Sequence, residues 1–340
     1  MINKIAVKKI LAILLCSIAF PGIKLIAQDP LFSQFYANPL YLSPSFAGAS
    51  KMGTRISGNY RNQWPSIPKT FTTYNLAFDH FFDKIRSGVG AFVLRDVAGT
   101  ARLSTTYYSF LYSFDFKMDE LWHVRPGLSL SYMNTGLNFN SLVSYSEITQ
   151  DPVESTEVIP LESNNDIDLN VSAILYRDIF WSGITLSHLL KPNLYFYNEN
   201  IDKSRSVFSS VKYSLFGGYR LRLRGNLLKY YKESLTLAFL FEKQKKYNQM
   251  NLGAYYHINP LVFGIWYRGI PVMKGNPGHD AMVFLLGYQM TDFINLGYSY
   301  DLTISGLSPS SGGAHEISLV YHFKVRERQR KPQALPCPDI

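Results

Sequence analysis

The sequence predicts an all-β protein, an antiparallel transmembrane β-barrel of about 14 strands. Three observations support this fold class. Apolar and polar residues alternate over most of the chain, aromatic residues make up 15% of it, and charged residues make up only 17%. After the first 27 residues, no apolar stretch approaches the roughly 20 residues that a membrane-spanning helix needs. An exported, aromatic-rich chain of this kind favours a barrel over a soluble sandwich.

The alternation is clearest between Ser104 and Lys117. Successive side chains of a strand point to opposite faces of the sheet, so this segment has one aromatic face and one mixed, polar face. We expect the aromatic face to contact lipid and the polar face to line the lumen, because an arginine or lysine at mid-bilayer costs about 2–4 kcal/mol. The aromatic face comprises Thr106, Tyr108, Phe110, Tyr112, Phe114 and Phe116.

The whole alternating region covers 52–324, and we interpret it as the outer-membrane β-barrel. An even number of strands suits a bacterial single-chain barrel, and such barrels place short turns in the periplasm and long loops outside. Tight turns and longer connections alternate here, and the longest loop covers 140–165. We therefore expect both termini in the periplasm. The predicted strands are 52–62, 69–82, 86–97, 101–118, 121–139, 166–178, 180–191, 207–223, 232–243, 247–258, 261–270, 280–291, 293–304 and 314–324.

The first 27 residues are typical of a signal peptide. Lys4, Lys8 and Lys9 precede an apolar run, and Ala27 offers a small residue at a cleavage site. Cys16 lies in this segment, so the mature chain has one cysteine, Cys337, and no internal disulfide. Cys337, as a lone exported cysteine, is expected to be inert or to form an intermolecular disulfide with another protein.

Two segments flank the predicted barrel. Residues 28–51 are apolar and aromatic but interrupted by Pro30, Pro39 and Pro44, which disfavours a strand or a long helix. We expect this segment to pack inside the lumen, as a plug, or against its periplasmic mouth. Residues 325–340 form a basic tail, which we expect in the periplasm as a solvated end or as a docking segment.

The sequence indicates binding rather than catalysis. The net charge of +9 does not favour nucleic acid as a partner, because the chain is exported. The seven histidines are scattered, and no metalloprotease, hydrolase or phosphate-binding motif is present. We therefore expect no enzymatic activity, no cofactor and no metal ion.

One local group of residues is a candidate partner-binding site: Tyr60, Arg61, Gln63 and Trp64. A planar cation beside aromatic rings at an extracellular rim is suited to grip a partner. The alternative is structural, with Trp64 in the interfacial aromatic belt and Arg61 in the lumen or at a lipid headgroup. Other charged residues are expected to form a lumenal salt-bridge network, namely Arg95, Asp96, Arg125, Asp168, Glu242, Arg268, Asp301 and Glu316.

The N-terminal segment resembles the opening of the PorP/SprF family of type IX secretion proteins. The resemblance rests on the motifs QDPLFSQF from residue 28 and NPLYLSPSFAG from residue 38, and it continues in YRNQW from residue 60. The stretch DVAGT from residue 96 is a looser match. The motif residues are Asp29, Pro30, Phe32, Ser33, Gln34, Asn38, Pro39, Pro44 and Gly48.

This resemblance implies an integral outer-membrane protein of the Bacteroidota that acts in type IX secretion and gliding motility. Its expected partners are a secreted, adhesin-like surface protein or the C-terminal domain of that cargo, components of the periplasmic machinery, and outer-membrane lipid. The expected role is to help export or anchor the cargo. Two alternatives remain from the residues: a FadL-like barrel of 14 strands that transports hydrophobic small molecules, and a general porin.

Overall fold

The computed structural model describes residues 29–50, 53–67, 71–99, 102–137, 163–194, 208–224, 233–245, 247–269, 281–304 and 312–324. The predicted signal peptide, the basic tail with Cys337 and nearly all of the predicted loop 140–165 lie outside these residues. The chain divides into two compact units, Met1–Leu31 and Phe32–Ile340, and the elements named below all belong to the second.

The described residues of this unit form strands with two short helical turns before them. All 14 predicted strands are confirmed, with small shifts at their ends. The fourth predicted strand is interrupted at Asp115, which leaves a two-residue strand, β5, as its continuation. The strands are β1 (Gly53–Gln63), β2 (Phe71–Phe82), β3 (Ser87–Ala98), β4 (Leu103–Phe114), β5 (Phe116–Lys117), β6 (His123–Gly136), β7 (Ser163–Arg177), β8 (Phe180–Ser187), β9 (Lys212–Arg224), β10 (Glu233–Gln244), β11 (Tyr247–Ile258), β12 (Leu261–Arg268), β13 (Ala281–Gln289), β14 (Ile294–Thr303) and β15 (Ala314–Lys324).

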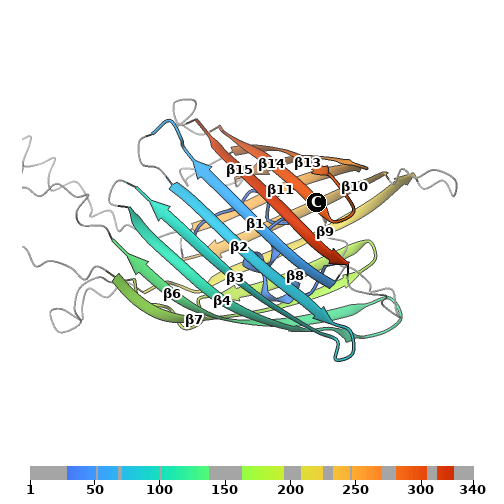
Figure 1. Ribbon diagram of the computed structural model, residues 1–340, viewed down its shortest axis with the longest axis horizontal. Helices are drawn as coiled ribbons and strands as arrows, with labels where there is room; N and C mark the ends of the chain where they lie inside the picture. Colours follow the sequence, from blue (N-terminus) through green and yellow to red (C-terminus); the bar gives the residue numbers. More distant parts are fainter. Residues whose placement is uncertain are drawn as a thin grey trace, which may run out of the picture. The chain divides into compact units, whose positions relative to one another are not determined.

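The sheet closes on itself. Each strand pairs antiparallel with the next along the chain, except that β4 pairs with β6 and not with β5. β1 also pairs with β15, so that Gly53 lies opposite Lys324 and Gln63 opposite Ala314. Because β4 and β5 both pair with β6, they act as one strand, and the barrel has 14 strands with one extra piece. Figure 1 shows the strands side by side around this closed sheet. Closure satisfies the backbone groups that lipid cannot hydrogen-bond.

The predicted separation of faces is confirmed. On β4, Phe110 is 70% exposed on the outer face, whereas its neighbour Leu111 is only 4% exposed and points inward. The same alternation holds on β15, where Ile317 and Leu319 face outward and Glu316 and Ser318 are buried. One prediction is wrong: Arg95 lies on the exposed outer face of β3, because its neighbour Asp96 points inward and adjacent strand residues cannot share a face.

The barrel has two different ends. At one end the connections are tight, as at 83–86, 178–179 and 259–260; we call this the short-turn end. At the other, the long-loop end, β6 and β7 are separated by 26 positions of sequence, 137–162. β1 begins at the short-turn end and finishes at the long-loop end. Among the described residues, no helix is long and apolar enough to cross a membrane.

Candidate functional site

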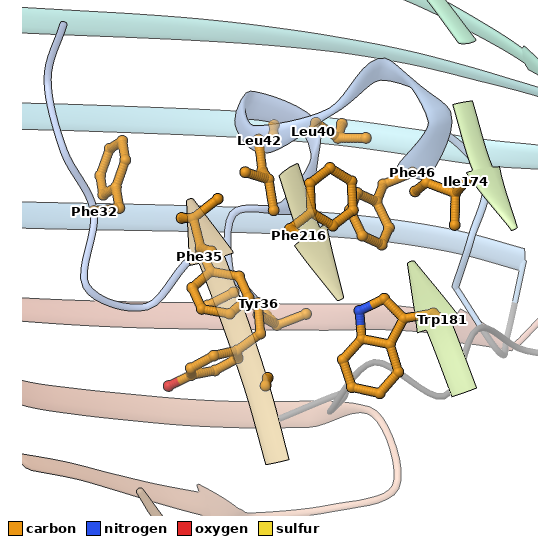
Figure 2. Close-up of a cluster of buried hydrophobic side chains, with 14 of the residues drawn as sticks. Phe32, Phe35, Tyr36, Leu40, Leu42, Phe46, Ile174, Trp181 and Phe216 are labelled. Carbon is orange, nitrogen blue, oxygen red and sulfur yellow. The ribbon is translucent and has the colours of Figure 1, made fainter. Parts of the chain in front are cut away.

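The segment Phe32–Ser50, which we call the strap, lies inside the barrel. Its apolar side chains Phe32, Phe35, Tyr36, Leu40 and Phe46 are all buried against inward-facing residues of the wall (Figure 2). Of the two placements expected for this segment, the lumen and the periplasmic mouth, the described residues from Phe32 on lie in the lumen. Two prolines shape it, because each occupies the start of a short helical turn where no N–H is needed: Pro39 opens α2 (Pro39–Leu42) and Pro44 opens η1 (Pro44–Phe46).

The first residues of the strap contact a buried group of charges at the long-loop end. This latch cluster consists of Arg61 on β1, Arg268 on β12, Asp301 on β14 and Glu316 on β15. Arg61 pairs with Asp301 at 2.7 Å and with Glu316 at 3.3 Å. Arg268 pairs with Asp301 at 2.8 Å. The four side chains are therefore one connected network of two cations and two anions, as buried charges require.

Ser33 forms a hydrogen bond with every member of the latch cluster. Its hydroxyl donates to Asp301 at 2.7 Å and accepts from Arg61 at 2.7 Å and from Arg268 at 2.8 Å. Its backbone N–H donates to Glu316 at 2.7 Å. Four hydrogen bonds with charged partners, which are stronger than neutral ones, hold this one residue in place.

Gln34 completes the same contact and is fully buried. Its N–H donates to Glu316 at 3.1 Å, and its side-chain amide donates to the Glu316 carbonyl at 2.9 Å. Its side-chain oxygen accepts from the Ser318 hydroxyl at 2.6 Å. A Cβ at Gly297 would lie 2.4 Å from the Ser318 hydroxyl and 2.5 Å from the Gln34 oxygen, so both side-chain ends would have to shift.

The middle of the strap packs on aromatic residues of the wall. Phe35 meets Trp266 edge-on, with ring centroids 5.0 Å apart, and Tyr36 meets Tyr255 in the same way at 5.1 Å. Such edge-to-face pairs add to the stabilisation from burial. The Trp266 ring lies over Gly253, where a Cβ would be 2.2 Å from it. The lumen is therefore apolar where the middle of the strap contacts it, and polar at the latch cluster.

The last part of the strap, Pro44–Gly48, lies directly on the wall at the short-turn end. A Cβ at Gly127 would be 2.3 Å from the backbone nitrogen of Ser45, and one at Gly88 would be 2.0 Å from the carbonyl oxygen of Ala47. The same carbonyl accepts from the Ser113 hydroxyl at 2.8 Å. Two backbones approach this closely only where side chains are missing.

Side-chain bonds hold this part of the strap as well. The N–H of Gly48, which has a φ of 68°, donates to Asp79 at 2.9 Å. Asp79 also accepts from Arg55 at 2.8 Å. The hydroxyls of Ser45 and Ser172 lie 2.6 Å apart. The strap thus crosses the lumen from the latch cluster to the start of β1.

The predicted motif residues fall mostly in the strap. Ser33, Gln34, Pro39, Pro44 and Gly48 have the roles described above. Two others are in the strap as well: Phe32 packs edge-on against Tyr41, and Asn38 accepts a 2.8 Å hydrogen bond from Asn75. Asp29 and Pro30 belong to the first unit of the chain.

The structure does not bring the four predicted partner-binding residues together. Tyr60 faces outward and stacks obliquely on Tyr74, whereas Arg61 is 3% exposed in the lumen. Gln63 ends β1. Trp64 follows at the long-loop end, where its N–H donates to the Gly313 carbonyl at 2.7 Å and its ring packs on Phe71. That these residues bind a partner stays a prediction.

The predicted lumenal charge network exists in part. Arg268, Asp301 and Glu316 join Arg61 in the latch cluster. Four other predicted members have different partners. Asp168 pairs with His188 at 2.8 Å and Glu242 with Lys212 at 3.7 Å, and Asp96 accepts a 2.5 Å hydrogen bond from Thr73. The Arg125 guanidinium lies over the rings of Phe81 and Tyr176.

Sequence reasoning missed the wall residues that receive the strap, above all Gly88, Gly127 and Gly297. Their only local signal is a glycine at a predicted inward position of a strand, which indicates close approach of another chain segment. Within the described part of the chain, no three His, Cys, Asp or Glu side chains gather as a metal site would require.

The family model described as "Type IX secretion system membrane protein PorP/SprF" matches residues 25–321. No curated protein sequence matches the chain. Solved structures with a similar fold include the outer membrane protein Omp33 of Acinetobacter baumannii (8% identity, 81% of this chain and 100% of that one, TM-score 0.45) and a Pseudomonas aeruginosa FadL homologue (11% identity, 79% and 90%, TM-score 0.42).

Proposed function

Because the chain belongs to the PorP/SprF family of type IX secretion system membrane proteins, we propose that this outer-membrane barrel binds a secreted surface protein and helps to export or anchor it. The recognised part would be an adhesin-like cargo or its C-terminal domain. The mechanism is presentation of a rigid surface at the long-loop end, with no bond chemistry. Contact with periplasmic components of the machinery is part of the same proposal.

The observation that supports binding over a general porin is the strap in the lumen. The strap occupies it with buried aromatic rings and with the bonds of Ser33 to the latch cluster. A general porin needs an open, water-filled channel, whereas here the strap places buried aromatic rings inside the barrel. The surface available to another protein is then the long-loop end, which in this class of barrel faces the outside.

The orientation of the barrel belongs to this proposal. We place the short turns and the C-terminal tail in the periplasm and the long loops outside the cell. The strap itself begins near the long-loop end, where Ser33 contacts the latch cluster, although both termini are expected on the periplasmic side. The location of the residues before Phe32 stays a prediction.

Affinity purification from the native outer membrane, followed by mass spectrometry, tests the proposed function. We expect recovery of a secreted surface protein together with type IX components. Recovery of neither class of protein would contradict the proposal.

A pair of matched variants tests which end binds. Trp64→Ala alters the long-loop rim. Trp122→Ala alters the short-turn end, where that ring packs near Phe180 and under Arg177. We expect Trp64→Ala to reduce recovery of the surface protein and Trp122→Ala to leave it unchanged. Equal loss in both variants would argue against cargo binding at the long-loop end.

A further inference from the structure

The strap is held at its two ends by different kinds of contact. At the long-loop end, Ser33 and Gln34 are held by hydrogen bonds with the latch cluster and its neighbours. At the short-turn end, the backbone of Pro44–Ala47 lies against wall glycines. The hydrogen bonds at the long-loop end can break one at a time, and water molecules can take the place of Ser33 and Gln34 as partners of the wall groups. The contact at the short-turn end is close packing, which water cannot replace.

The latch cluster is electrically balanced without the strap. It contains the two cations Arg61 and Arg268 and the two anions Asp301 and Glu316, and their three ion pairs involve no strap atom. Departure of Ser33 would therefore leave no uncompensated charge.

Some buried polar atoms in and near the latch cluster have no hydrogen-bond partner among the described residues. Arg61 Nε and Asp301 Oδ1 have no hydrogen-bond partner among the described residues, and neither have the two side-chain polar atoms of the nearby Asn59. Buried polar groups of this kind are normally satisfied by water. The latch end of the lumen is thus suited to hydration once the strap leaves it.

The other end is fixed by chain continuity as well as by packing. The Gly48 N–H donates a hydrogen bond to Asp79, and the Ser50 hydroxyl is hydrogen-bonded to His322 Nδ1 at 3.0 Å. Both residues lie just before β1 begins at Gly53. The strap cannot leave this end without disturbing the first strand of the barrel. Pro44–Gly48 are therefore the anchored end of the strap.

We propose that the strap is a gate that opens from its latch end. Ser33 and Gln34 leave the latch cluster, Phe35 and Tyr36 follow from the wall, and Pro44–Gly48 remain in place. The opened lumen conducts ions. This inference is independent of cargo binding, since it concerns only contacts inside the barrel.

The test is single-channel conductance of the full mature protein in planar lipid bilayers. The latch variant is Ser33→Ala with Gln34→Ala, which removes strap side chains and leaves the four wall charges unchanged. We expect the time spent conducting to rise by roughly tenfold or more, because hydrogen bonds with charged partners are lost. The control is Gly58→Ala on the outer face, where the new Cβ would lie 4.0 Å from the Asn75 carbonyl oxygen, and it should match the wild type.

A cross-link distinguishes a hinged gate from a plug that leaves entirely. Ser45→Cys with Ser172→Cys introduces two thiols where two hydroxyls are 2.6 Å apart, and Cys337→Ser removes the remaining thiol of the mature chain. Added to the latch variant, the oxidised pair should leave its conductance unchanged.

Two results would overturn the gate. In the first, the latch variant conducts no more than the wild type, although its unheated sample migrates on a gel differently from its heated sample, as a folded barrel does. In the second, the oxidised cross-link abolishes the conductance and reduction restores it, because the strap would then have to leave as a whole.

Discussion

The backbone N–H of Ser33 donates a 2.7 Å hydrogen bond to Glu316, across a sequence separation of 283 residues. Glu316 is fully buried on the last strand, and its second oxygen accepts from the Gln34 N–H. The N-terminal motif that contains Ser33 and the last strand of the barrel are therefore parts of one site. The following predictions test the contacts on which that site and the barrel depend.

Loss of the Glu316 charge should destabilise the barrel. In Glu316→Gln, two arginines would face one carboxylate in a buried site, and breaking a buried ion pair by removing one partner costs about 3–5 kcal/mol. The free energy of unfolding in urea, followed by tryptophan fluorescence in detergent micelles, measures this loss.

The double variant Arg61→Gln with Glu316→Gln restores charge balance and serves as the control. We expect it to lose less stability than the sum of the two single variants. Additive effects within about 0.5 kcal/mol would show that the two residues do not interact as their 3.3 Å separation indicates.

Adding a methyl group at Gly127 should displace the strap. The new Cβ would lie 2.3 Å from the Ser45 nitrogen and 2.6 Å from its Cα, which are backbone atoms that cannot rotate away. Overpacking of this kind costs about 1–3 kcal/mol. The measurement is the temperature at which heating converts the folded band on a gel to the unfolded band. It should fall for Gly127→Ala and stay constant for Gly58→Ala. An unchanged temperature for both would contradict the close backbone contact.

Charge on the lipid face should impair membrane assembly. Phe110 is 70% exposed on the outer face of β4, so Phe110→Arg places a cation against hydrocarbon at a cost of about 2–4 kcal/mol near the midplane. Folding yield into lipid vesicles measures the effect, and Phe110→Leu, which stays apolar, should fold like the wild type. Equal yields for the arginine and leucine variants would mean that Phe110 does not face lipid.

Asp119 in the tight turn before β6 should titrate below its usual range. The N–H of Trp122 and then that of Leu121 donate to its carboxylate at 2.7 Å, which lowers its pKa from 3.8. A lowered pKa means that this stabilisation is present above the unfolded value and is lost as the pH falls through the folded value. The Trp122 amide shift in NMR spectra should titrate with a midpoint below 3.8. Asp119→Asn should abolish the titration, and a midpoint at or above 3.8 would refute the contact.

Much of the barrel was predictable because its pattern is local. Alternation along each strand identified all 14 strands and their lipid faces, since a strand points successive side chains to opposite sides wherever it is placed. The error at Arg95 was also local: it ignored that Asp96, the next residue, must face the other way. The prolines and aromatic residues before β1 likewise predicted a segment that packs without being a strand.

The partners of that segment were decided only by the tertiary structure. Ser33 looks like an ordinary serine in the sequence, and its bonds to Arg61, Arg268, Asp301 and Glu316 arise because barrel closure brings four separate strands around one point. In the same way, Arg61 is an ordinary strand cation until closure places it inside, opposite two carboxylates. The sequence by itself determined a strap and a barrel, because both follow from neighbouring residues. Which residues hold one in the other depends on contacts between residues far apart in the chain, and only the closed sheet sets those.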